Sequence, residues 1–154
     1  MSVEVDVQYA VMADGVPSVS DIETWIGAVV RGRRENVQLT VRIVDEEEGT
    51  ELNERWRQAR GPTNVLSFPS EGLEAITPDL LGDVVICAPV VESEAREQGK
   101  SLTAHWTHMV IHGTLHLLGF DHVDEDHARE MELLEAQILK ELGYSDPYES
   151  VIDS

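Results

Sequence analysis

The sequence predicts an α/β fold of the α+β kind, in which a small four-stranded mixed β-sheet is packed with about five helices. Short alternating or continuous apolar stretches, rich in Val and Ile, are typical of strands. Longer stretches with apolar residues three and four positions apart are typical of helices. These stretches follow one another in the order β-α-β-α-β-β-α-α-α. We expect the 154 residues to form a single domain, 1–154, because a chain of this length buries a sufficient core.

The first half of the chain alternates strands with helices. Its expected elements are a strand over 3–8, a helix from about 20 to 31, a strand over 37–44 and a helix between Asp45 and the turn at 61–63. Ser20 and Glu23 have the spacing of a capping box, and Asp45 can cap the second helix. The first two strands can pair in parallel through a right-handed crossover.

The second half places two strands side by side in the sequence, followed by three helices. The expected elements are strands over 64–69 and 83–88, and helices over 89–99, 103–118 and 124–142. Proline and glycine mark most of the boundaries. A loop over 70–82, rich in Gly, Pro and Asp, joins the two strands. These strands are therefore expected to form an antiparallel edge.

Charge and composition bear on the possible partners. The net charge of −19 and a pI of about 4.4 argue, taken alone, against a nucleic-acid partner, because phosphate is bound by clustered Lys and Arg. Six of the eleven basic residues are nevertheless clustered: Arg31, Arg33, Arg34, Arg55, Arg57 and Arg60. The chain has no apolar stretch long enough to span a bilayer and no signal-peptide pattern, so we expect a cytoplasmic protein without a membrane partner. The single cysteine, Cys87, is expected to be buried and inert.

Three histidines have the spacing of a metal site. His112, His116, Gly119 and His122 fit the metzincin pattern H-E-x-x-H-x-x-G-x-x-H, but Gly113 stands in the position of the catalytic Glu. Histidines four apart leave one face of a helix. Gly119 ends that helix, so the third histidine can approach from another direction. We therefore expect the three histidines to hold one metal ion.

The other residues of this region are expected to play supporting parts. His108 extends the same row but lies too far along the helix to complete the ligand set, so it should be a neighbour of the site. Asp121 could fix the tautomer of a ligand imidazole or could only serve the turn. His105 and His127 are expected at the surface. Zinc is the preferred ion for three imidazoles, although nickel or copper would also bind, and the fourth position is left for water.

The glycine at position 113 bears on the substrate. A metalloprotease needs its Glu to move protons, so a peptide would be hydrolysed slowly here. A phosphodiester instead needs its developing charge stabilised, which a metal-activated water or hydroxide and an arginine can do. The pattern is therefore compatible with a phosphodiester substrate such as RNA and unfavourable for a peptide. Two alternatives remain: a peptidase or amidase that uses Asp83, Glu71 or Glu74 as its base, and a non-catalytic protein with a structural metal.

Four segments resemble the YbeY family of bacterial ribosomal-RNA maturation endoribonucleases: HGTLHLLGFDH (112–122), PTNVLSFP (62–69), LGDVVIC (81–87) and GYSDPY (143–148). The resemblance implies a zincin-like fold with one Zn²⁺ per chain, held by the three histidines in a cleft beside an edge strand. It also implies a single-strand-specific endoribonuclease that acts in 16S rRNA 3′-end maturation and in quality control of the 70S ribosome. The implied partners are the 16S precursor RNA, the 30S subunit, a small-subunit ribosomal protein and an assembly GTPase. With these partners, the non-catalytic alternative becomes a ribosome assembly factor that binds the ribosome without cutting RNA.

The resemblance further implies a functional arginine at Arg57, upstream of the P-T-N-V segment. A planar guanidinium suits phosphate contacts, so Arg57 and His112 are the expected catalytic residues. Arg60 stands where many relatives carry Asp, and it adds positive charge near the expected cleft. Together with Asn64 and Ser67, it is expected to bind substrate.

Overall fold

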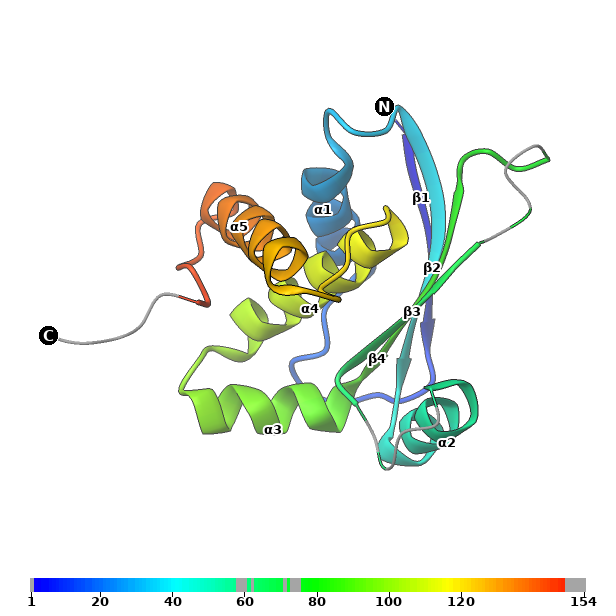
Figure 1. The fold of residues 1–154 in the computed structure, drawn as a ribbon. Helices are drawn as coiled ribbons and strands as arrows, with labels where there is room; N and C mark the ends of the chain where they lie inside the picture. The colour runs from blue at the N-terminus through cyan, green and yellow to red at the C-terminus, as the bar shows by residue number, and fades with distance from the viewer. Residues whose placement is uncertain (1, 58–60, 62, 71, 73–75, 149–154) are drawn as a thin grey trace, which may run out of the picture.

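The structure, a computed structural model, describes residues 2–57, 61, 63–70, 72 and 76–148. The described part of the chain contains four strands and five helices in the predicted order (Figure 1). They are β1 (Ser2–Tyr9), α1 (Val19–Val30), β2 (Asn36–Val44), α2 (Glu46–Arg57), β3 (Val65–Pro69), β4 (Leu80–Cys87), α3 (Ala88–Gln98), α4 (Leu102–Leu117) and α5 (Glu125–Glu141). The predicted fold class is confirmed.

The strands form one mixed sheet in the order β1-β2-β4-β3. β1 and β4 both pair with β2 in parallel, whereas β3 pairs with β4 in the antiparallel direction. The parallel first pair and the antiparallel edge are therefore as predicted. β3 is left at one edge of the sheet, with α4 packed beside it (Figure 1).

The largest apolar cluster lies between the sheet and the helices α1 and α4. On β2 the residues that face this core alternate along the strand, and each is at most 3% exposed: Val37, Leu39, Val41 and Ile43. Trp106 and Val110 of α4 pack in the same cluster. Full burial of an aliphatic side chain contributes roughly 1.5–3 kcal/mol, so these contacts fix α4 against the sheet. A smaller cluster with Leu52 of α2 covers the opposite face.

Two expected boundaries are wrong. The first helix begins at Val19 because Ser18, and not Ser20, accepts a hydrogen bond from the backbone N–H of Asp21. β4 begins at Leu80, inside the predicted loop. Gly82 makes this longer strand possible: its φ is +137°, and a Cβ there would lie 2.2 Å from the carbonyl oxygen of Phe68. Asp45 caps α2 as predicted, with its Oδ1 accepting from the N–H of Glu48 at 2.9 Å.

None of the helices in the described part of the chain is both long and apolar enough to cross a membrane.

Candidate metal centre

Helix α4 carries two of the three expected ligands. Ile111 and Leu115 on its inner side are fully buried, which turns His112 and His116 toward the edge strand β3. The helix ends at Leu117. Gly119 follows the capping residue Leu118 with a φ of +101°, and the Phe120 N–H donates to the Leu115 carbonyl at 3.1 Å. This is a glycine-terminated helix end that turns the chain back. The returning segment brings the third histidine to the first two.

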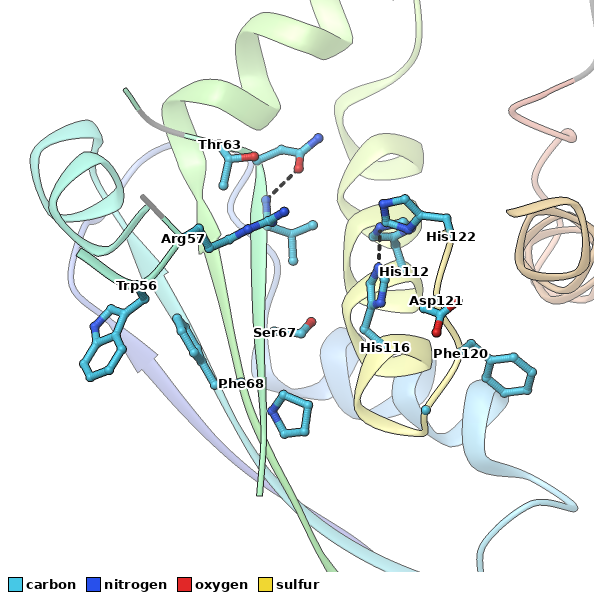
Figure 2. A pocket seen from close by; sticks show the side chains of 14 residues that line it. Trp56, Arg57, Thr63, Ser67, Phe68, His112, His116, Phe120, Asp121 and His122 are labelled. Atoms are coloured by element: carbon cyan, nitrogen blue, oxygen red, sulfur yellow. Dashed lines mark hydrogen bonds between the residues drawn. The ribbon is translucent and has the colours of Figure 1, made fainter. Parts of the chain in front are cut away.

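The three imidazoles converge on one point at the mouth of a cleft (Figure 2). The ring centroids of His112 and His116 are 4.7 Å apart, and His122 lies 5.0 Å from His116 and 5.7 Å from His112. The Nε2 atoms of His112 and His116 are 3.2 Å apart. A tetrahedral zinc ion with bonds of about 2.0–2.1 Å separates two ligand nitrogens by roughly 3.3 Å. The arrangement fits one such ion.

A buried carboxylate stands behind the first ligand. Glu135 of α5 is fully buried, and its Oε2 accepts a hydrogen bond from His112 Nδ1 at 2.6 Å. Its Oε1 accepts from His108 Nε2 at 2.6 Å and from the hydroxyl of Tyr148. Burial raises the pKa of this carboxyl, but the hydrogen bonds from the two histidines outweigh burial and lower it to about 2. The ionised carboxylate can only accept, so His112 carries its proton on Nδ1 and presents Nε2 to the centre.

The sequence analysis did not find Glu135, although one signal was present. An acidic residue occupies a core position of the last helix, between Met131 and Ile138, which are both buried. A charged side chain is almost never fully buried without partners. The position should therefore have prompted a search for those partners among the histidines.

His108, His112 and Glu135 lie close enough together to be considered as a second metal-binding set. Both nitrogen–oxygen separations in it are 2.6 Å. Two ligand atoms that share a zinc ion stand about 3 Å or more apart. The set is therefore a hydrogen-bonded cluster, and it places His108 beside the triad.

The predictions for His105, His127 and Asp121 have different outcomes. His105 is wrong as a surface residue, because it is 2% exposed and its Nε2 lies 2.8 Å from Glu94 of α3. Burial lowers its pKa more than the hydrogen bond with Glu94 raises it. His127 is exposed, as predicted. Asp121 Oδ1 accepts from the N–H of Val123 at 3.4 Å, which agrees with the turn role considered for it.

A cleft of about 670 Å³ separates the histidines from β3 and the end of α2. Arg57, the last residue of α2, extends from the opposite wall toward the cleft (Figure 2). Among the described residues it makes no ion pair within 4 Å. The guanidinium is therefore free to meet an anion lying between it and the histidines.

Of the three residues expected to bind substrate, two line the cleft and the third is not described. Ser67 of β3 lines the cleft, and its hydroxyl donates to the carbonyl oxygen of Gly113 at 2.9 Å. Asn64 also lines it, but its Nδ2 donates to Glu94 at 3.2 Å and its Oδ1 accepts from the Val65 N–H. Both side chains are already engaged within the protein. Arg60 lies outside the described residues.

Of the three acids considered as an alternative base for a peptidase, the structure describes only Asp83. Asp83 is exposed and does not line the cleft; it alternates on β4 with Val84, which faces α4. Glu71 and Glu74 lie outside the described residues.

The glycine at position 113 has a steric cause. A Cβ built on Gly113 would lie 2.7 Å from Cγ1 of Val84, 3.1 Å from Cγ2 of Val65 and 3.4 Å from Oγ of Ser67. Ordinary contacts between carbon atoms are about 3.5–4.0 Å. The helix lies so close to β3 and β4 that a side chain at this position would force α4 or its neighbours to shift. The absence of a glutamate at position 113 thus follows from the close packing of α4 against the sheet.

Comparison with known proteins agrees with this picture. Residues 14–143 match the family described as Endoribonuclease YbeY. The chain belongs to the endoribonuclease YbeY family. One member, the Endoribonuclease YbeY of Stutzerimonas stutzeri strain A1501, is 54% identical over 147 residues, which are 95% of this chain and 91% of that protein. Like other YbeY proteins, this chain is an endoribonuclease, an enzyme that cleaves phosphodiester bonds within RNA.

A solved structure supports the fold separately. The solution structure of TM1509 from Thermotoga maritima superimposes with a TM-score of 0.60, at 23% identity, over 99% of both chains. At this identity the likeness concerns the fold alone. The histidines, Gly113 and Arg57 all fall inside the stretch that matches the YbeY family, whereas Tyr148 lies beyond it.

Proposed function

We propose that this chain is a zinc-dependent endoribonuclease that cuts single-stranded RNA in 16S rRNA 3′-end maturation and in quality control of the 70S ribosome. One observation carries the proposal: a cleft in which three convergent imidazoles face a guanidinium that has no ion-pair partner among the described residues, with no carboxylate at position 113. A phosphodiester lying between the two walls would have a cation site on each side. Both would favour a substrate that gains negative charge during the reaction.

The parts of the site act as follows. His112, His116 and His122 would hold the ion, which when bound supplies positive charge to the phosphate and makes water a better nucleophile at neutral pH. Arg57 binds the non-bridging phosphate oxygens in its planar fork and stabilises the charge that grows on them. Ser67 fixes β3 to α4 through the Gly113 carbonyl, which keeps the two walls at a constant separation.

The partners follow from the charge of the chain. A protein of net charge −19 is repelled by RNA at long range, so a protein partner would have to bring it to its substrate. We propose the 30S subunit, a small-subunit ribosomal protein and an assembly GTPase for this part, in the cytoplasm. Within the part of the chain that the structure describes, Arg57 makes no ion pair, which supports local recognition of phosphate once the chain has been delivered.

The test uses naked precursor RNA and intact ribosomal particles with four proteins, each assayed for bound metal. These are the wild type and the variants His116→Ala, Arg57→Ala and Arg55→Ala. Arg55 is the matched control, because it sits on the same helix but stacks over Trp56, with its guanidinium carbon 5.6 Å from the ring centroid. We expect His116→Ala to lose both metal and cleavage. Arg57→Ala should keep its metal and cleave on the order of 100-fold more slowly, and Arg55→Ala should resemble the wild type.

Four results would contradict the proposal. Loss of zinc from Arg57→Ala would show that this residue acts through the fold. Equal losses of cleavage in Arg55→Ala and Arg57→Ala would show that both residues act only through the overall positive charge of the helix. If the metal-loaded wild type cleaved casein and left single-stranded RNA intact, the substrate class would be wrong. Arg57→Ala that retained full function in cells would favour a non-catalytic assembly factor instead.

A further inference from the structure

Besides the three expected ligands, the structure contains a polar cluster that the proposed mechanism does not use. It consists of Glu135, His108 and Tyr148, and it adjoins the centre through His112. Glu135 is fully buried and His108 is 7% exposed. We propose that Glu135 is the positioning residue of metal ligand His112, and that Tyr148 holds Glu135 in place from the C-terminal segment.

The geometry of Glu135 sets the ring of His112. The His112 Nδ1–H donates to Oε2 at 2.6 Å, so the imidazole can neither flip nor change its tautomer without leaving a buried carboxylate oxygen unpaired. The opposite ring nitrogen, Nε2, is thereby fixed toward the Nε2 of His116. Carboxylates in this position orient a histidine ligand and raise its basicity.

Glu135 is itself held by two donors on its other oxygen. His108 Nε2 donates to Oε1 at 2.6 Å, and the hydroxyl of Tyr148 donates to the same atom. The hydroxyl also lies 3.1 Å from His108 Nε2, and the two rings meet edge to face with centroids 5.5 Å apart. Glu135 is therefore fixed on both oxygens and has no freedom to leave His112.

Tyr148 reaches this cluster from outside the helical layer. It follows the end of α5 by seven residues and lies beside His108 of α4. There Pro147 and Tyr148 line a cavity of about 290 Å³. Tyr148 is 45% exposed, so burial of its own ring does not account for its position. The contact with Glu135 does.

A second buried pair of the same chemistry provides a control. His105 of α4 bonds to Glu94 at 2.8 Å, one turn before His108, but neither residue touches an expected ligand. If Glu135 acts only by satisfying a buried histidine, removal of either carboxylate should have similar effects. If it positions a ligand, only Glu135 should matter to the metal.

The experiment measures the zinc affinity of the purified full chain by competition with a chelator, in Glu135→Gln, Tyr148→Phe and Glu94→Gln. Glutamine has one acceptor in place of two, so it cannot serve both histidines. We expect Glu135→Gln to bind zinc about 10- to 100-fold more weakly. Tyr148→Phe should be about 2- to 10-fold weaker, since one hydrogen bond is removed and the ring is kept. Glu94→Gln should match the wild type.

Nitrogen NMR of the imidazoles gives a second measurement. In the zinc-loaded wild type the His112 Nδ1 should carry a slowly exchanging proton, and this signal should weaken in both Tyr148→Phe and Glu135→Gln but not in Glu94→Gln. Wild-type zinc affinity in Glu135→Gln would overturn the inference, and so would equal losses in Glu94→Gln. If Glu135→Gln does not fold, the zinc affinity of Tyr148→Phe is the test, and a wild-type value would overturn the inference.

The inference rests on the proposed metal site and not on RNA cleavage. Failure of the wild type to bind zinc would end both the proposed centre and the role of Glu135. Tight zinc binding that is insensitive to Glu135 would end only the latter.

Discussion

Introducing a single methyl group at position 113 tests whether packing excludes the glutamate of a metalloprotease. In Gly113→Ala the added Cβ would meet Val84 Cγ1 at 2.7 Å and Val65 Cγ2 at 3.1 Å. Neither atom belongs to a long flexible side chain, so α4 must move outward by up to about 1 Å to restore contacts of about 3.5–4.0 Å. Overpacking of this kind costs about 1–3 kcal/mol.

The opposing term is helix propensity. Alanine is favoured over glycine inside a helix by about 1 kcal/mol, and position 113 lies well inside α4. The two terms together predict a decrease of about 0–2 kcal/mol in the free energy of unfolding. The sign is informative, because propensity alone predicts a gain in stability.

Chemical denaturation of the metal-free protein measures this change, with two further variants as controls. Gly27→Ala places the same methyl group in α1, where no heavy atom lies within 4 Å of the new Cβ, so this variant should be stabilised by about 1 kcal/mol. In a Val84→Ala background the shorter of the two contacts is removed and only that with Val65 at 3.1 Å remains, so Gly113→Ala should cost less than in the wild type or become neutral. A Gly113→Ala variant as stabilised as Gly27→Ala would refute the steric argument.

Three further predictions concern stability and titration. Asn53→Ala should lower the free energy of unfolding by about 1–2 kcal/mol, because the buried amide donates to the Gly61 carbonyl at 2.7 Å; urea denaturation would show it. Burial and the neighbouring histidines lower the pKa of His116 to about 4, so the unfolded chain binds more protons than the folded one between about pH 4 and 6.5. Stability of the metal-free protein should fall as the pH drops through this window, followed as Tm at several pH values, and zinc should move the loss to lower pH. Asp124→Asn should return the raised pKa of His127 toward its ordinary value, since the hydrogen bond and charge of Asp124 raise it; proton NMR titration would detect no change if this cause were wrong.

The parts of the fold that the sequence predicts well are those set by local pattern. Alternating apolar residues along Val37–Ile43 predict a strand with one buried face, and these residues are buried. A glycine after the apolar pattern of α4 predicts the end of a helix, and Gly119 has the left-handed backbone expected there. Both signals lie within a few neighbouring residues. The same is true of the three histidines, whose spacing on a helix and a turn is itself a local feature.

The parts that the sequence did not predict depend on contacts between distant segments. Gly82 reads as a loop residue until β3 is placed against it, and His105 reads as a surface residue until α3 supplies Glu94. Glu135 is the clearest case, because its partners lie 27 and 23 residues earlier on α4. Ser18 differs from these, since both it and Ser20 have suitable capping spacing and only packing decides between them.

The proposed site has a carboxylate at Glu135 but none at position 113, and the positions of the two relative to a bound phosphate account for the difference. A carboxylate about 4 Å from a bound phosphate would oppose it by roughly 4 kcal/mol at an effective dielectric constant of about 20, and the penalty falls with distance. A glutamate at position 113 would stand at the wall between α4 and β3, where Ser67 lines the cleft. Glu135 lies behind the ring of His112, on the side away from Nε2. In the proposed site it could therefore orient a ligand while the imidazole separates its charge from the substrate. Arg57 lines the other wall of the cleft, from which it would face the phosphate.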